Sequence, residues 1–316
     1  KYLVDSGLTI SKDGKHNDRF RERLMFPIHN LTGKVIGFGG RILTSDKTKP
    51  KYVNSPESEV YNKSKSLYGI WLARNSIVAR DNCFLVEGYT DVISLHQSGI
   101  ENVVASSGTS LTTDQIRLIS KFTRNITILY DGDPAGIKAS FRGIDMILEQ
   151  GMNVKVVLFP DGEDPDSYAR KHSSSDLEGF ISTNSDDFIA FKTRLLLDET
   201  QNDPVKKAGL IHEIIHTISL IPDPIIRPLF IRECAEIMQI AEQTLMNELN
   251  KLLRKKKLKG YESESQEQIP EPVIIAPPQE LAPDISDCSA QELDVIRMLL
   301  LFGSKEIKVR LQSDDP

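Results

Sequence analysis

Cysteine is scarce in this chain of 316 residues, which holds three, at positions 83, 234 and 288. They are widely separated and form no C-x-x-C pair, which excludes a cysteine zinc site and a dense disulfide framework. Long apolar runs are also missing: the longest, such as Met298–Phe302, are far shorter than the roughly 18 residues that a bilayer-spanning helix needs. The sequence therefore predicts no transmembrane helix and a reducing, cytoplasmic compartment.

The start of the sequence lacks two further features. Lys1 stands where a start methionine would be, and no basic segment followed by an apolar one opens the chain. We therefore expect no secretory signal, and we interpret the sequence as a fragment.

Charge is distributed unevenly, although the total of 39 Lys and Arg against 45 Asp and Glu is nearly balanced. Basic and acidic residues number 15 and 7 in residues 1–80, 8 and 17 in 81–190, 12 and 9 in 191–260, and 4 and 12 in 261–316. A basic block beside an acidic one is expected if one surface attracts phosphates and the other holds metal cations. A patchwork of solvated charges gives similar counts, so the charge leaves both interpretations open.

Short apolar runs alternate with helical stretches from Cys83 onward. The predicted strands are residues 83–86, 102–105, 126–130 and 154–158, and the predicted helices are 91–98, 112–122 and 135–149. Strands separated by crossover helices indicate an α/β fold, a parallel sheet with helices on both faces. In such sheets the chemistry lies at the carboxyl ends of the strands.

The regions on either side of this sheet show other patterns. Strand-like runs at 23–28 and 35–38 predict a basic α+β subdomain before the sheet, and helical periodicity after it predicts a small helical bundle. Five prolines among residues 261–287 indicate a linker, and Ser289 to Glu292 fits a capping box before a further helix. The domain limits that follow are 1–80, 81–186, 187–260, 261–287 and 288–316.

Acidic residues follow three of the predicted strands. Glu87 comes directly after the first, Asp131 and Asp133 after the third, and Asp164 with Asp166 a few residues after the fourth. Carboxylates gathered at one sheet edge raise each other's pKa unless cations lie between them. Each motif alone also fits a turn. Their joint occurrence on successive strand ends favours bound metal.

The residue types indicate which metal. Oxygen ligands with no His or Cys nearby favour Mg²⁺ or Mn²⁺ over zinc. Two such ions about 4 Å apart would activate an attacking oxygen and stabilise a leaving one. The pattern therefore suits phosphoryl chemistry on nucleotides.

The same motifs resemble those of a known family. Glu87-Gly-Tyr-Thr-Asp91, Asp131-Gly-Asp133 and Asp164-Pro-Asp166 are similar to the three acidic motifs of the TOPRIM fold, shared by primases, topoisomerases and some nucleases. Upstream segments resemble the RNA polymerase domain of bacterial replicative primases; they lie at residues 19–28, 33–41, 51–57, 61–63 and 67–69. The resemblance runs from about Asp18 to Asp166, about half of the chain.

The resemblance implies a DNA-directed RNA polymerase. Such an enzyme makes short RNA primers on single-stranded DNA from ribonucleoside triphosphates, by nucleotidyl transfer that depends on Mg²⁺ or Mn²⁺. The implied catalytic residues are Glu87, Asp131 and Asp133, and the implied metal ligands are these three with Asp164 and Asp166. The implied phosphate contacts are Arg19, Arg21, Arg41, Lys51, Asn54 and Lys63. Asp91 is acidic in the family as well, although a position near a helix N-terminus also explains it.

Further expectations follow from the resemblance. His29 stands where the family often has Arg, and Gly37, Gly39 and Gly40 are expected to let the backbone bend or approach nucleic acid closely. No zinc is expected in this fragment, because the family's zinc module is not part of it. The segment from Ser289 to Phe302 looks like the start of a truncated helicase-binding domain. The expected partners are therefore template, nucleotides, primer and a replicative helicase at a bacterial replication fork, with no membrane.

Other functions remain open on the sequence. A DNA-cleaving TOPRIM enzyme would use the same metals with Tyr89 or Tyr130 as nucleophile, or an activated water. A phosphatase of the haloacid dehalogenase type would use Asp131 as nucleophile, but Pro134-Ala135 stands where Thr or Val normally follows the second Asp. A non-catalytic DNA-binding or helicase-tethering module would have these acids as structural turns.

Overall fold

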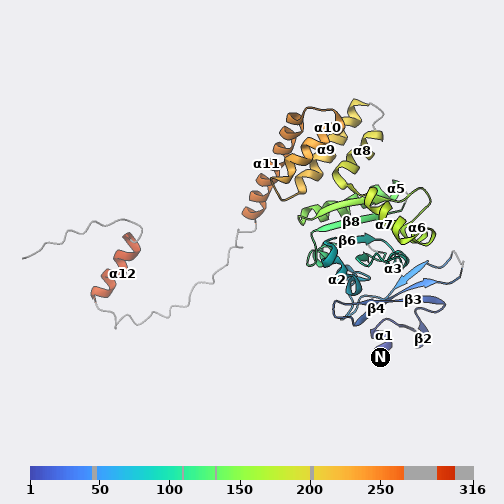
Figure 1. The fold of residues 1–316 in the computed structure, drawn as a ribbon. Helices are drawn as coiled ribbons and strands as arrows, with labels where there is room; N and C mark the ends of the chain where they lie inside the picture. Colours follow the sequence, from blue (N-terminus) through green and yellow to red (C-terminus); the bar gives the residue numbers. More distant parts are fainter. Residues whose placement is uncertain (45–47, 109, 132–133, 200–202, 267–289, 303–316) are drawn as a thin grey trace, which may run out of the picture. The chain divides into compact units, whose positions relative to one another are not determined.

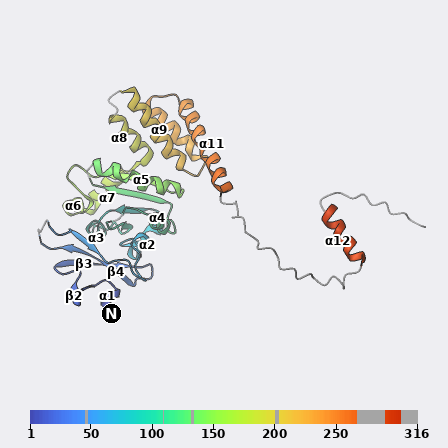
Figure 2. The same cartoon turned by 180° about the vertical axis from the view of Figure 1, so that it is seen from behind.

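The computed structural model describes residues 1–44, 48–108, 110–131, 134–199, 203–266 and 290–302. Its contacts divide the chain into two units, Lys1–Gly260 and Tyr261–Pro316. The first unit contains a small N-terminal sheet, a central sheet and a group of helices, which Figure 1 and Figure 2 show from opposite sides. In the part of the chain that is described, no helix is long and apolar enough to cross a membrane.

An antiparallel sheet in the order β3-β4-β5 organises the N-terminal region. The elements there are α1 (Tyr2–Asp5), β1 (Thr9–Lys12), β2 (Lys15–Asp18), β3 (Arg23–His29), β4 (Val35–Ile42), β5 (Tyr52–Asn54), η1 (Lys63–Lys65) and α2 (Ile70–Arg80). The turn between β3 and β4 is fixed by Asn30, whose Oδ1 accepts hydrogen bonds from the backbone N–H groups of Thr32 and Lys34, both at 3.0 Å. The predicted pair of strands joined by a turn is confirmed.

Glycines in β4 make room for aromatic rings. A Cβ on Gly39 would lie 2.4 Å from the ring of Tyr89, and one on Gly40 would lie 2.5 Å from that of Phe20. A Cβ on Gly37 would be 3.0 Å from the ring of Tyr61. The strand therefore runs through these glycines to Ile42 instead of ending at Phe38. The structure thus gives these glycines the role of making room for the protein's own rings, and the expectation that they serve bending or contact with nucleic acid stays a prediction.

The central sheet has the strand order β10-β9-β8-β6-β7, and four of its strands are parallel. Its strands are β6 (Cys83–Val86), β7 (Val103–Ala105), β8 (Asn125–Tyr130), β9 (Asn153–Leu158) and β10 (Asp186–Asp187). The four predicted strands are confirmed, with β8 and β9 each beginning one residue earlier and β7 one residue later. The short β10, antiparallel to β9, was not predicted.

Helices cover both faces of this sheet, as predicted. They are α3 (Tyr89–Gln97), α4 (Thr113–Ile119), α5 (Pro134–Glu149), α6 (Pro165–Lys171) and α7 (Ser174–Thr183). Buried side chains of α3, α6 and α7 form the core on one face, and those of α2, α4 and α5 form it on the other. The apolar residues of both cores thus hold the carboxyl ends of the strands in fixed positions.

The helical region after the sheet consists of α8 (Phe188–Glu199), α9 (Pro204–Leu220), α10 (Ile226–Met238) and α11 (Glu242–Gln266). Pro204 occupies the first turn of α9, where the Asp203 side chain caps the backbone N–H of Val205 at 2.9 Å. The predicted helical bundle is confirmed. Residues 261–266, predicted as the start of the linker, are helical because α11 continues to Gln266. The domain limits themselves remain predictions.

A buried lysine joins the helical region to the central sheet. Lys192 on α8 is 2% exposed, and its Nζ lies 3.0 Å from Glu213 Oε1 and 3.0 Å from Thr217 Oγ1 on α9. The same ammonium lies 4.8 Å from the ring centroid of Phe141 on α5, and Thr217 Oγ1 donates to Asp145 Oδ1 on α5 at 3.3 Å. Both views show α5 between the sheet and α9 (Figures 1 and 2). This polar contact therefore connects α8 and α9 to the helix that follows Asp131.

The second unit contains α12 (Ala290–Phe302). Its apolar side chains are exposed, among them Leu299 at 65% and Leu300 at 82%. Ser289, the predicted capping residue, lies outside the described residues.

Candidate active site

A pocket of about 940 Å³ opens at the carboxyl ends of the parallel strands. Four carboxylates line it, and they come from the ends of three different strands: Glu87 and Asp91 after β6, Asp131 after β8, and Asp164 after β9. Further lining comes from Lys51 and Tyr52, the last residues of β6 and β8, the start of α3, the segment between β7 and α4, and four residues of α5, which are Arg142, Gly143, Ile144 and Met146. The pocket therefore lies where a parallel sheet is expected to place its chemistry.

Glu87 and Asp91 are positioned by the start of α3. Glu87 is exposed and directly follows β6, and Gly88 is the N-cap residue of α3. The Gly88 N–H donates to Asp91 Oδ2 at 2.9 Å, which turns the Asp91 side chain back toward the end of β6. The helix consequently starts at Tyr89, two residues before the predicted start.

The environment of the pocket shifts the pKa of Asp91. The pKa of Asp91 is raised to about 7, mainly by burial and in smaller part by the charges of Asp131, Asp164 and Asp166, against the lowering effect of the Gly88 N–H. Charges act on each other in this way only at short range. The prediction that acids from separate strand ends gather at one edge is therefore confirmed for Glu87, Asp131 and Asp164, which line one pocket. Asp91, for which the sequence left both a site role and a helix N-terminal role open, lies among them.

The two acids of the third motif, Asp164 and Asp166, have different roles. Asp164 lines the pocket and also caps α6, since its Oδ1 accepts from the Ser167 N–H at 2.6 Å. Asp166 does not line the pocket. Its Oδ1 accepts from Ser94 Oγ on α3, and its Oδ2 lies 2.6 Å from an Arg170 guanidinium nitrogen. Both oxygens of the Asp166 carboxylate are therefore bound by side chains of the protein itself.

The acids present suit a hard divalent cation, since all are oxygen donors whose mutual repulsion a cation would relieve. Asp133, a predicted ligand, lies outside the described residues. Among the residues that are described, no group of three or more His, Cys, Asp or Glu side chains is close enough together to hold a metal ion. The pocket therefore collects candidate ligands without forming a complete ligand set.

Two cationic side chains line the same pocket. Lys51 was predicted, and its Nζ lies 5.9 Å from the ring centroid of Tyr52, which also lines the pocket. Arg142 was not predicted, because in the sequence it is one exposed residue of an amphipathic helix. Only the position of α5 beside the strand ends shows that Arg142 reaches the pocket.

Asn54 and Lys63 hold the segment after β7. Asn54 Nδ2 donates to the Ser107 carbonyl at 3.0 Å, its Oδ1 accepts from Tyr89 Oη at 2.8 Å, and Lys63 Nζ donates to the Gly108 carbonyl at 3.3 Å. Ser107 and Gly108 line the pocket, with left-handed φ angles of +57° and +78°. Both predicted residues are therefore near the site, where they position its wall. The segment they hold was missed by sequence reasoning, and its run of Ser and Gly was the available signal.

Three predicted arginines do not line the pocket. Arg41 lies over the ring of Tyr52, 5.9 Å from its centroid, and Arg21 is exposed, 3.8 Å from Glu22. Arg19 has a buried Nε without a hydrogen-bond partner. Their contact with nucleic acid remains a prediction.

The tyrosines considered as nucleophiles are both buried. Tyr89 is 2% exposed, and burial raises the pKa of its hydroxyl above the usual range. Tyr130 is 5% exposed. A buried phenol is a poor nucleophile toward a DNA phosphate, so these positions disfavour a covalent DNA-cleaving mechanism.

Three family models match the chain. They describe the N-terminal domain of the DNA primase catalytic core at residues 1–74, a Toprim-like domain at 84–169, and a DnaB-helicase binding domain of primase at 191–243. The last match falls on α8 to α10, whereas the sequence pattern placed the start of a helicase-binding domain at 288–316. The placement at 288–316 stays a prediction.

Curated relatives are similar over most of this chain. The chain is 38% identical to the DNA primase of Clostridium acetobutylicum over 247 residues, which are 77% of this chain and 40% of that protein. It is 37% identical to the DNA primase of Halalkalibacterium halodurans over 267 residues, 84% of this chain and 44% of that protein. The chain thus spans about two fifths of the length of the curated relatives it matches.

Solved structures of primase domains are similar to this chain in both sequence and fold. A DNA primase domain from Pseudomonas aeruginosa superposes with a TM-score of 0.69 at 34% identity, covering 78% of each chain. A DnaG primase catalytic domain bound to ssDNA superposes with a TM-score of 0.66 at 37% identity, covering 74% of this chain and 76% of that one. Because it shares both sequence and fold with these domains over most of their length, this chain belongs to the family of bacterial DNA primases, with the Toprim fold in its central sheet.

Proposed function

We propose that this chain carries the nucleotidyl-transfer centre of a DNA primase, which makes short RNA primers on single-stranded DNA from ribonucleoside triphosphates during replication. The observation that carries the proposal is the pocket, where four carboxylates from three strand ends lie with two cationic side chains. The DNA-bound primase domain among the structural neighbours supports single-stranded DNA as the template.

A primase core with a Toprim fold implies divalent metal in general. We propose Mg²⁺ or Mn²⁺, held by Glu87, Asp131 and Asp164, with Asp133 as a further ligand. When bound, such ions stabilise charge on the reacting phosphates and favour ionisation of the attacking hydroxyl. Asp166 is the weakest of the predicted ligands, because Ser94 and Arg170 engage its carboxylate.

The chain's own residues bind and orient the reactants. Lys51 and Arg142 attract the triphosphate, with Arg142 able to contact two oxygens of one phosphate. This places the α-phosphorus against the primer's 3′ oxygen, which forms the new bond while pyrophosphate leaves. Glu87, exposed in the pocket, accepts the proton of the 3′ hydroxyl.

Incorporation of ribonucleotides on a single-stranded template, with Mg²⁺ or Mn²⁺, tests the proposal. Asp131→Asn removes one charge from the pocket and should lower incorporation by about a hundredfold or more, the range seen when a charge-stabilising group is removed from an active site. Template affinity should be retained. Asp161→Asn is the matched control, because Asp161 is an exposed acid after β9 that does not line the pocket. Normal primer yield from Asp131→Asn would refute the assignment.

The match at residues 191–243 supports a replicative helicase as partner. We propose that α8 to α10 contribute to that contact. Leu229 on α10 is a large apolar side chain that is 65% exposed, so Leu229→Ser should weaken helicase binding measured by fluorescence anisotropy. The same substitution should leave ribonucleotide incorporation on a free template unchanged, because Leu229 does not line the pocket.

A further inference from the structure

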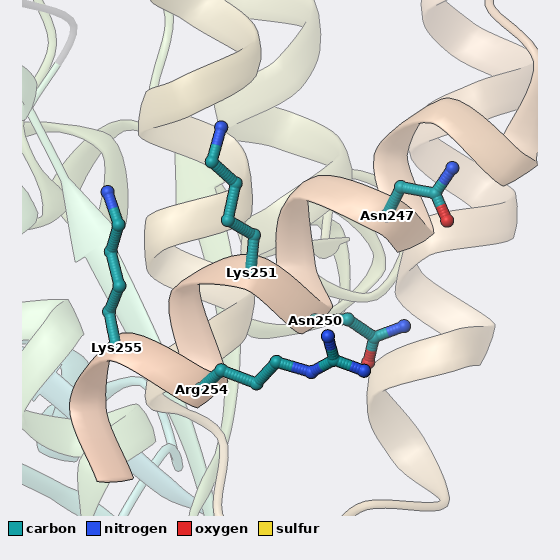
Figure 3. A pocket seen from close by; sticks show the side chains of 5 residues that line it. All are labelled: Asn247, Asn250, Lys251, Arg254 and Lys255. Atoms are coloured by element: carbon teal, nitrogen blue, oxygen red, sulfur yellow. The ribbon is translucent and has the colours of Figure 1, made fainter. Parts of the chain in front are cut away.

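The exposed face of α11 carries a hollow of about 330 Å³, well outside the catalytic pocket. Its lining comes entirely from this helix: Asn247, Asn250, Lys251, Arg254 and Lys255. Intervals of three and four residues bring these side chains onto one face of the helix. Figure 3 shows Lys251 and Lys255 projecting side by side, one turn apart, while the Arg254 side chain extends beside Asn250. We call these five residues the α11 patch.

The α11 patch is positively charged and offers mainly hydrogen-bond donors. Three of its members are cationic and the other two are amides, and no carboxylate lines it. Glu248 lies 3.3 Å from Lys251, but the Lys251 side chain remains 61% exposed. Arg254 and Lys255 are exposed and have no ion pair within the described part of the chain. Unpaired cations side by side repel each other, and an anionic ligand relieves that repulsion.

The neighbouring Lys256 has a different role. Its Nζ donates to the Ser219 carbonyl at 3.4 Å, and burial is the main cause that lowers its pKa. Lys256 therefore attaches α11 to the end of α9. This contact holds the backbone that carries the patch, so its side chains stay on the same face of the protein before a ligand binds.

We infer that the α11 patch binds the sugar–phosphate backbone of single-stranded template DNA, as a second contact separate from the catalytic pocket. From Asn247 to Lys255 the helix rises about 12 Å, enough for the phosphates of about three stacked nucleotides. Amide groups and cations are the side chains that contact phosphate and sugar oxygens. No aromatic ring lines the patch, so it offers no stacking platform for bases and binds without sequence preference. This inference rests on the proposed function for the identity of the strand.

The position of the patch determines which templates reach it. The helix α5 starts after Asp131 at the pocket and ends at Glu149, whose charge acts on Lys256 of α11. Sixteen residues of α-helix are about 24 Å long. The patch therefore lies toward the opposite edge of the sheet, and only a template that extends well beyond the pocket can occupy both.

The test compares two triple variants of the whole chain by fluorescence anisotropy, on thymidine oligomers of about 4 to about 30 nucleotides. The patch variant is Lys251→Gln with Arg254→Gln and Lys255→Gln. The control is Lys121→Gln with Lys206→Gln and Lys207→Gln, which removes the same charge from the surface outside the patch. Gln is a good helix former, and thermal melting checks that both variants fold like the wild type.

Affinity measured against salt gives the expected result. On long oligomers, the slope of log K against log salt should fall by about 2 in the patch variant, at about 0.7 for each of three phosphates. The control should keep the wild-type slope, and wild type and patch variant should bind the shortest oligomers alike. Equal slopes for patch variant and wild type on long oligomers would overturn the inference, and an equal loss on oligomers of every length would do the same.

The outcome is separable from that of the proposed function. If incorporation survives Asp131→Asn while the length-dependent slope is found, the proposed function fails and the α11 contact stands. If incorporation is lost in Asp131→Asn but the slopes are equal, the α11 contact alone fails. Patch-dependent binding of an acidic protein, with unchanged binding to DNA, would also reject the inference.

Discussion

The central sheet and the helical region bring functional side chains together in different ways. The pocket acids are far apart in the chain and meet because parallel strands end at the same edge. The α11 patch arises within nine consecutive residues, because a helix places every third and fourth side chain on one face. In the first arrangement Asp91 is largely buried and its pKa responds to the neighbouring carboxylates, whereas the cations of the second are exposed and screened by salt. A reaction that needs several charged groups close together therefore suits the strand ends of the central sheet. Reversible binding of a DNA backbone suits the exposed face of α11.

Among the substitutions considered, replacement of Lys192 should most strongly weaken the contact between the helical region and the central sheet. Lys192→Ala should lower the free energy of unfolding by about 2–5 kcal/mol, because it empties the space of a fully buried side chain and removes the donor to buried Thr217 on α9. Urea denaturation measures this loss. Lys206→Ala on α9 is the control, since that exposed side chain should contribute within about 0.5 kcal/mol. Similar values for the two variants would show that the buried cation does not hold the regions together.

Gly39→Ala tests the contact between the N-terminal sheet and the wall of the pocket. The new Cβ would lie 2.4 Å from the ring of Tyr89, which is 2% exposed and packs 4.9 Å from the ring of Phe26. Room for the new Cβ requires the packed Tyr89 ring or β4 to shift, so the substitution should cost about 1–3 kcal/mol of unfolding free energy. Tyr89 also holds Asn54, so ribonucleotide incorporation should fall below the wild-type value even at temperatures where the variant is folded.

Gly179→Ala provides the matched control. Gly179 lies in α7, where nothing would touch a Cβ within 4 Å. Alanine there should be neutral or stabilising by up to about 1 kcal/mol. Equal thermal stability of the two variants would contradict the close approach of Tyr89 to β4.

Asp187 gives an expected effect that appears only as a dependence of stability on pH. Burial raises the pKa of Asp187 to about 6, against the lowering effect of backbone hydrogen bonds from Ile189 and Ala190. Between about pH 4 and 6 the folded protein therefore binds more protons at this site than the unfolded chain, so its contribution to stability decreases as pH rises. Asp187→Asn keeps an acceptor for the Ile189 N–H and should flatten urea-denaturation stability over that interval by about 1–3 kcal/mol.

This pH effect sharpens the comparison with the pocket. Asp91 is also a half-buried acid with a raised pKa, but other carboxylates contribute to its shift. Added Mg²⁺ should therefore reduce the pH dependence that comes from the pocket and leave the part due to Asp187 unchanged. In the Asp187→Asn variant, Mg²⁺ should still change the pH dependence of stability by as much as it does in the wild type. Loss of this Mg²⁺ effect in the variant would contradict its assignment to the pocket.

The sequence predicts the sheet and most of its acids for one physical reason. Apolar strands that are connected by crossover helices form a parallel sheet, and the residues that follow such strands therefore meet at one edge of that sheet. Glu87, Asp131 and Asp164 could therefore be placed together before the fold was known. The N-terminal hairpin could be read in the same way from its alternating pattern and its turn.

Other features depend on packing in space and could not be read from local pattern. Arg142 reaches the pocket only because α5 lies beside the strand ends. Asp166 has the same motif context as Asp164, yet Ser94 and Arg170 engage its carboxylate. The role of Gly39 follows from a ring that belongs to a residue fifty positions later. Each of these depends on a partner distant in sequence.

Direct measurement of metal binding tests the central claim, that acids from separate strand ends converge into a site for a divalent cation. Mn²⁺ binding followed by electron paramagnetic resonance needs neither template nor nucleotide. Wild type and Asp161→Asn should bind Mn²⁺ alike, and Asp131→Asn should bind it at least about tenfold more weakly, equivalent to about 1.4 kcal/mol. Equal Mn²⁺ affinity in Asp131→Asn and wild type would contradict the account.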